Sequence, residues 1–219
     1  MPMPGNEPKE DKDILPGGPE IVPGEYSFKI TLNEQTVEAK AKVLADPRYQ
    51  VNSSDLKENY LMQRQFVNMN TTLAMAAKKL VTSKVDIKLV KELADKTLEL
   101  VKDNKEEHPA TALNKKADKL LETIESLDKS LRSQPKTVGI VDTSYKVSSK
   151  VGIGYYYVAS AYGKPSVTAE KYMDLAKASL KKGVEDVNNF LSKDLVEFKA
   201  EFQKSGLSLL SQTEPVMIQ

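Results

Sequence analysis

The sequence predicts a mainly α protein: an antiparallel bundle of four to five helices with a long C-terminal helix, preceded by a small β-hairpin. Two periodicities predict this fold. Between about residues 25 and 44 apolar and polar residues alternate, as in a strand with one buried face. From about residue 53 apolar residues recur at steps of three and four, as in a helix with one buried side. The 219 residues suffice for one large domain, or for a small module and a medium one.

Residues 1–24 are rich in proline and glycine, which is typical of a linker or an extended arm. The segment lacks the apolar stretch of a signal peptide, so we expect any export signal of the parent protein to lie outside this chain.

Residues 25–48 predict a β-hairpin. The apolar residues at alternate positions are Tyr26, Phe28, Ile30 and Leu32 in the first strand, and Val37, Ala39, Ala41 and Val43 in the second. Asn33 and Glu34 form the turn, where Asn tolerates a left-handed backbone, and Asp46-Pro47 ends the second strand. Because a two-stranded hairpin is marginal in water, its apolar face must be covered by the arm, by the bundle or by another domain.

Residues 53–210 predict the bundle. A first helix begins near residue 53 with Asp55 and Glu58 as its capping pair, and a second helix precedes a break at 103–109. A third helix has the most regular apolar seam. The apolar positions are Leu56, Tyr60, Val67, Leu73, Ala77 and Leu80 in the first helix, Val90, Leu93, Thr97, Leu100 and Val101 in the second, and Leu113, Ala117, Leu120, Ile124, Leu127 and Leu131 in the third.

After a loop at 132–143, residues 143–162 suit a strand by composition and a helix by spacing and length, and we interpret them as a helix. Gly152 and Gly154 either weaken this helix or let a neighbouring helix come close. A final long helix is predicted from a Thr168 cap to a stop at Gly206, and it bends, overhangs the bundle or breaks near Gly183. Its apolar positions are Tyr172, Leu175, Ala176, Leu180, Val184, Val187, Leu191, Leu195, Phe198 and Phe202.

Composition argues against several classes of function. With 32 basic and 31 acidic residues the net charge is +1, which gives no field for nucleic acid or an anionic membrane. Apolar runs fall short of the roughly 20 residues that a membrane-spanning helix needs, so we expect no membrane insertion. The absence of cysteine excludes disulfides, thiol nucleophiles and cysteine-ligated metals.

No residue is assigned to catalysis, to a cofactor or to a metal. His108 is the only histidine, and we interpret it as a loop residue just before a helix. Gly152-Ile153-Gly154 does not continue into a phosphate-binding fingerprint. The acidic residues with lysines three or four positions away predict solvated helix faces, although a paired-carboxylate site remains an alternative. They are Glu92, Asp95, Glu99, Asp118, Glu122, Glu125 and Asp128.

Tyrosines form the most unusual local composition. Tyr155, Tyr156 and Tyr157 are consecutive, and Tyr162 follows shortly after. Because consecutive residues of a helix point in three directions, one or two of these rings must face out of the core. Partly exposed tyrosines often lie at interfaces, so this group is either ordinary packing at the edge of the bundle or a contact surface for a partner.

Three segments carry a resemblance to a known family. They are Pro23-Gly24-Glu25-Tyr26 with Phe28, Ile30, Leu32, Val43 and Asp46-Pro47-Arg48, and the segments 161–165 and 202–207 of the helical part. Residues 15–210 resemble the C-terminal region of bacterial BNR-repeat, sortilin-like β-propeller proteins, often labelled glycosyl hydrolases. Asn33-Glu34 departs from the glycine-containing turn that is frequent in that family.

The resemblance implies that an upstream β-propeller of the same polypeptide is the partner and that the protein is extracytoplasmic. It implies that any glycosidase-like site lies on the propeller, outside this chain. The leading hypothesis is therefore a non-catalytic C-terminal accessory module that supports or docks the propeller, with Ile14-Leu15 or residues 20–22 as a third strand beside the hairpin. The alternatives are a stand-alone helical bundle that binds a partner or ligand through the tyrosines, and an enzyme with an unfamiliar carboxylate site.

Overall fold

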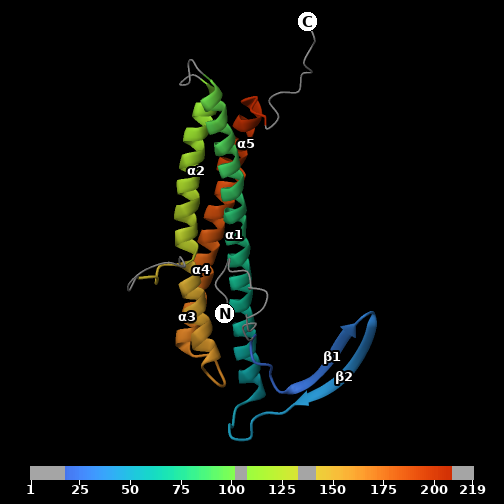
Figure 1. The fold of residues 1–219 in the computed structure, drawn as a ribbon. Helices are drawn as coiled ribbons and strands as arrows, with labels where there is room; N and C mark the ends of the chain where they lie inside the picture. Colours follow the sequence, from blue (N-terminus) through green and yellow to red (C-terminus); the bar gives the residue numbers. More distant parts are fainter. Residues whose placement is uncertain (1–17, 102–107, 133–141, 209–219) are drawn as a thin grey trace.

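The fold is a narrow helical bundle with a β-hairpin that projects from one end (Figure 1). The computed structural model describes residues 18–101, 108–132 and 142–208. The elements are β1 (Gly24–Leu32), β2 (Gln35–Val43), α1 (Ser53–Leu100), α2 (Pro109–Leu131), α3 (Val147–Ala159), α4 (Val167–Asn189), the π-helical turn η1 (Phe190–Asp194) and α5 (Leu195–Lys204). The predicted fold class, a mainly helical bundle preceded by a hairpin, is confirmed.

α1 runs the full length of the bundle, and the other helices pack along it (Figure 1). α2 contacts α1 and α5 in the half away from the hairpin, and α3 contacts α1 and α4 in the half near the hairpin. The buried residues form one continuous apolar core along these contacts, from Phe66 near α3 to Phe198 on α5. None of the described helices is sufficiently long and apolar to cross a membrane.

The hairpin forms with the predicted turn. β1 and β2 are antiparallel, with Leu32 opposite Gln35 and Gly24 opposite Val43. Asn33 and Glu34 both have positive φ, 46° and 67°, which is the backbone of the two-residue turn that matches strand twist. The described residues 18–23 contain no strand, so the third strand predicted at 20–22 is wrong; Ile14-Leu15 lies outside the described residues.

The first two predicted helices are a single helix, α1, of 48 residues. The buried residues Ser83 and Ile87 continue the apolar seam between Leu80, the last apolar position assigned to the first predicted helix, and Val90, the first assigned to the second. No glycine or proline interrupts this segment, and its other residues, 81, 82, 84–86, 88 and 89, are exposed on the other sides of the helix. The predicted capping pair is also wrong, because Asn52 is the N-cap and makes no side-chain capping bond, and Asp55 lies within the first turn.

The third predicted helix is confirmed as α2, whose seam is buried except for the half-buried Leu127. His108 is its N-cap, and its Nδ1 accepts a hydrogen bond from the backbone N–H of Ala110 at 3.2 Å. Residues 143–162 were interpreted as a helix, and α3 confirms this for residues 147–159. Of the two roles considered for its glycines, Gly154 permits close approach: a Cβ there would lie 2.4 Å from the Phe66 ring, whereas Gly152 faces open space.

The C-terminal helix differs from the prediction at its start and in its middle. Its N-cap is Ser166, whose Oγ accepts a hydrogen bond from the Ala169 N–H, and not Thr168. The helix does not break at Gly183, which is buried against Leu131 and Val147. The irregularity is η1 instead. Gly206, with φ of 70°, follows the end of α5 as predicted.

The π-helical turn η1 adds one residue to the regular helical spacing and so rotates the apolar side of the helix. Before the turn α4 packs against α3 and α1, and after it α5 packs against α2. One continuous helix thereby keeps an apolar side toward two successive neighbours. The predicted seam did not include this rotation. It also included Leu175 of α4, which precedes the turn and is 52% exposed.

Candidate interaction site

The hairpin has an apolar face that no described element covers. Across the two strands Tyr26 faces Ala41, Phe28 faces Ala39 and Ile30 faces Val37. Toward the tip this face is open to solvent: Ile30 is 67% exposed and Leu32 is 71% exposed. Neither the bundle nor the described part of the arm therefore covers this face. The exception is Tyr26, whose hydroxyl donates to the Val22 carbonyl at 2.6 Å.

The opposite, polar face of the hairpin is satisfied by its own cross-strand pairs. Lys29 lies 3.8 Å from the Glu38 carboxylate, and the hydroxyls of Thr31 and Thr36 are 3.1 Å apart. Such pairs stabilise a sheet and fix its register. Since the sheet among the described residues has two strands, each strand also has one outward edge of unpaired backbone groups. The hairpin is thus ordered and polar on one face, and apolar and unpartnered on the other.

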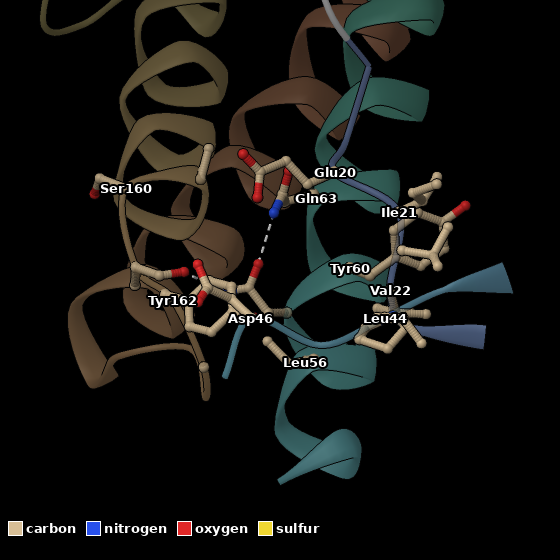
Figure 2. A pocket seen from close by; sticks show the side chains of 16 residues that line it. Glu20, Ile21, Val22, Leu44, Asp46, Leu56, Tyr60, Gln63, Ser160 and Tyr162 are labelled. Carbon is tan, nitrogen blue, oxygen red and sulfur yellow. Dashed lines mark hydrogen bonds between the residues drawn. The ribbon is translucent and has the colours of Figure 1, made fainter. Parts of the chain in front are cut away.

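A cavity of about 350 Å³ lies at the base of the hairpin, and we call it the root cavity (Figure 2). The arm at 20–23, the end of β2, the start of α1 and the segment 159–163 enclose it. Next to it Arg48 donates to both carboxylate oxygens of Asp46, at 2.5 to 3.1 Å, and so closes the turn after β2. These hydrogen bonds from Arg48 hold the pKa of Asp46 below its ordinary value.

Two buried amides form the inner wall of the root cavity. Asn59 Nδ2 donates to the carbonyls of Val158 and Ala161, at 3.1 and 3.0 Å, and so ties α1 to the end of α3. Gln63 Nε2 donates to Asn59 Oδ1 at 2.6 Å (Figure 2). Asn59 and Gln63 are 4% and 7% exposed. Because a buried amide without partners costs about 1–3 kcal/mol, these bonds fix the geometry where the arm, α1 and α3 meet.

The predicted tyrosine surface is divided between two places. Tyr156 is 67% exposed, and its ring contacts that of Tyr157, which stacks on Tyr172 of α4 with centroids 5.2 Å apart. Tyr162 lies beyond the end of α3, at the root cavity, where its ring is 4.7 Å from that of Tyr49. The four tyrosines therefore do not form one patch.

Tyr155 differs from its neighbours because it packs against the core. Burial, and to a smaller extent the negative charge of Glu20, raises the pKa of its hydroxyl. The structure thus keeps Tyr155 inside and places Tyr156 and Tyr157 outside, as expected from three consecutive helical positions.

The acidic residues considered for a carboxylate site do not converge. Asp128 is half-buried. The other six are exposed: Glu92, Asp95, Glu99, Asp118, Glu122 and Glu125. Several pair with neighbouring cations, as Asp118 does with Lys91 and Asp128 with Arg132. Within the described ranges, no group of three histidine or acidic side chains is placed to hold a metal ion.

One ion-pair cluster makes stability depend on pH. Lys116 of α2 contacts Glu197 and Glu201 of the C-terminal helix, at 2.8 and 2.6 Å. The hydrogen bond from Lys116 lowers the pKa of Glu197 from its ordinary 4.5. A lowered carboxylate pKa contributes stability above 4.5 that is lost as the pH falls through the folded-state value.

We therefore expect Lys116→Gln to reduce the free energy of unfolding slightly at pH 7, and we expect the difference from the parent to vanish as Glu197 becomes protonated below pH 4.5. Urea unfolding at several pH values measures this. Lys119→Gln on an exposed position of the same helix is the control. A difference that persists undiminished at low pH would show that packing by the lysine stem, and not charge, is responsible.

Sequence reasoning missed three structurally important polar residues: Asn59, Gln63 and Lys146, all less than a tenth exposed. A signal was present for the two amides, because they lie at helical spacing in line with Phe66 and continue its seam backward. Lys146 Nζ donates to the carbonyls of Lys129 and Arg132, at 2.9 and 3.2 Å, and so satisfies the C-terminal end of α2. Its partners are backbone atoms distant in sequence, which a residue pattern does not indicate.

Comparisons with models of protein families, with curated proteins and with solved structures found no match to this chain. The resemblance to the C-terminal region of propeller proteins therefore stays a prediction.

Proposed function

We propose that this chain is a non-catalytic interaction module. In this proposal the hairpin, which projects from the end of the helical bundle, docks onto a β-rich domain. The observation that carries the proposal is the ordered hairpin with its apolar face exposed around Phe28, Ile30 and Val37. Apolar surface in this arrangement is typical of a contact site.

A β-rich partner suits the hairpin in two ways. A hairpin of two strands gains stability when further strands or a covering layer are added, and a partner sheet can offer either. The resemblance implies that this partner is an upstream β-propeller of the same polypeptide, outside the membrane, which the chain would support as an accessory module.

A photo-crosslinking amino acid placed at Ile30 or at Thr31 tests the proposal. The two residues are neighbours on β1 and point to opposite faces of the hairpin. With the intact parent polypeptide expressed in its native cell, we expect crosslinks from position 30 to map to one β-rich domain, and few from position 31. Mass spectrometry of the crosslinked peptides is the measurement.

Equal crosslinking from both positions would contradict a specific apolar contact. Crosslinks from position 30 to a second copy of the hairpin would replace docking by self-association. Absence of crosslinks at position 30 would show that this face stays exposed to solvent and would end the proposal.

A second candidate is partner binding through the tyrosines of α3 and α4. It is favoured by the exposure of Tyr156 beside the stacked rings of Tyr157 and Tyr172. The same crosslinker at position 156 is its test: crosslinks to a partner from 156 and not from 30 would select this surface.

A further inference from the structure

We propose that the root cavity binds a protonated amine or a guanidinium group. This inference does not rest on docking of the hairpin, because the exposed apolar residues that carry that proposal, Phe28, Ile30 and Val37, do not line the cavity. It rests on the charges, the hydrogen-bond acceptors and the aromatic rings that line the cavity.

The charged side chains among the described lining residues are both acidic, Glu20 and Asp46. Asp46 is held by Arg48, which lies outside the lining and donates to both carboxylate oxygens. For Glu20 the described part of the chain provides no ion pair. Among the described residues, the exposed side chain of Glu20 is therefore the charged group at the cavity without an ion-pair partner, and Figure 2 shows it beside Gln63.

The inner wall adds a second acceptor, and its orientation is forced. Both protons of Asn59 Nδ2 are used by the carbonyls of Val158 and Ala161, so Asn59 can offer Gln63 only its Oδ1, an acceptor. Gln63 must then turn its Nε2 to Asn59, at 2.6 Å, which leaves Gln63 Oε1 as a free acceptor beside the second proton of Nε2. The buried wall thus offers an acceptor next to the Glu20 carboxylate, a combination that suits a cationic donor and repels an anion.

Aromatic rings complete the lining. Tyr60 of α1 and Tyr162 lie at the cavity, and the ring of Tyr49, which does not line it, contacts the ring of Tyr162 with centroids 4.7 Å apart. Rings of this kind attract an alkylammonium or guanidinium group through their faces. A volume of about 350 Å³ accommodates such a head group with a short alkyl chain.

The same chemistry is present in a lysine or arginine side chain of a polypeptide and in a free alkylamine or polyamine. The experiment is isothermal titration of the full chain at pH 7 with four probes: n-butylamine, spermidine, Nα-acetyl-lysine-methylamide and the uncharged n-butanol. We expect saturable binding of the amines and none of butanol. Tighter binding of the lysine amide than of butylamine would assign the site to a polypeptide side chain, and tightest binding of spermidine to a free amine.

Glu20→Gln removes the charge with little change in shape, and we expect it to weaken amine binding by roughly tenfold or more. Glu25→Gln, an exposed change on β1 that does not line the cavity, is the matched control and should leave binding unchanged. In an NMR titration with butylamine, we expect the largest changes in backbone chemical shift at residues 56–63 and 159–163. Equal affinity for butanol, no saturable amine binding, or undiminished binding by Glu20→Gln would overturn the proposal.

Discussion

Gly154→Ala will lower the free energy of unfolding, whereas Gly152→Ala, two residues earlier on the same helix, will raise it. A Cβ at Gly154 would lie 2.4 Å from two atoms of the Phe66 ring and 3.3 Å from Tyr172, and Phe66 is fully buried between the helices. Overpacking of this kind costs about 1–3 kcal/mol, which exceeds the gain in helix propensity. A Cβ at Gly152 meets nothing within 4 Å, so there the gain of up to about 1 kcal/mol remains.

Urea denaturation of the two variants and the parent measures the difference, and a double-mutant cycle identifies its cause. If the ring of Phe66 is what the new methyl group strikes, Phe66→Leu will cost less in the Gly154→Ala background than in the parent, with a coupling of about 0.5 kcal/mol or more. The same sign of effect at both glycines would contradict close helix approach at Gly154 and return it to a simple weak point of α3.

Lys146→Met will lower the free energy of unfolding by about 2–3 kcal/mol, which is large for the replacement of one charged side chain. Lys146 is 5% exposed, and its ammonium group donates to two carbonyls at the C-terminal end of α2, where the helix dipole also favours positive charge. Methionine keeps the stem and removes the donor, so the two carbonyls lose their partner.

The control is Lys129→Met on the same end of α2, where the ammonium group forms an exposed pair with Glu125 at 2.7 Å. Such pairs contribute about 0–1 kcal/mol, so this variant should behave nearly as the parent. Thermal and urea unfolding of both variants compare the two lysines. A small effect at Lys146, equal to that at Lys129, would show that solvent replaces the ammonium group at the helix end.

Much of the fold could be predicted because it depends on short-range patterns. The alternation in residues 25–44 and the Asn33-Glu34 turn identified the hairpin, and the three-four spacing identified α2 and α3. The continuity of α1 could not be predicted in the same way, since Ser83 is a polar residue in a buried position and interrupted the apolar pattern. η1 shifts the helical phase from Phe190 onward, and such a shift is set by which neighbour the helix meets.

The candidate site was less predictable than the fold. The tyrosines were found by composition, but their division between α3 and the root cavity depends on where the chain turns after Ala159. The root cavity is made by four segments far apart in sequence, and its inner wall is set by bonds between residues about one hundred positions apart. No local pattern carries that information, because it arises only when α1 and α3 are packed together.

The length of α1 has a mechanical consequence. At 1.5 Å per residue its 48 residues span about 70 Å, with the hairpin at one end and the first turn of α2 at the other (Figure 1). A load applied to the hairpin would be carried along one uninterrupted column of backbone hydrogen bonds, braced on its sides by the remaining helices. If the hairpin docks a domain as proposed, the bundle would act as a strut that sets the distance between this domain and the opposite end of the molecule.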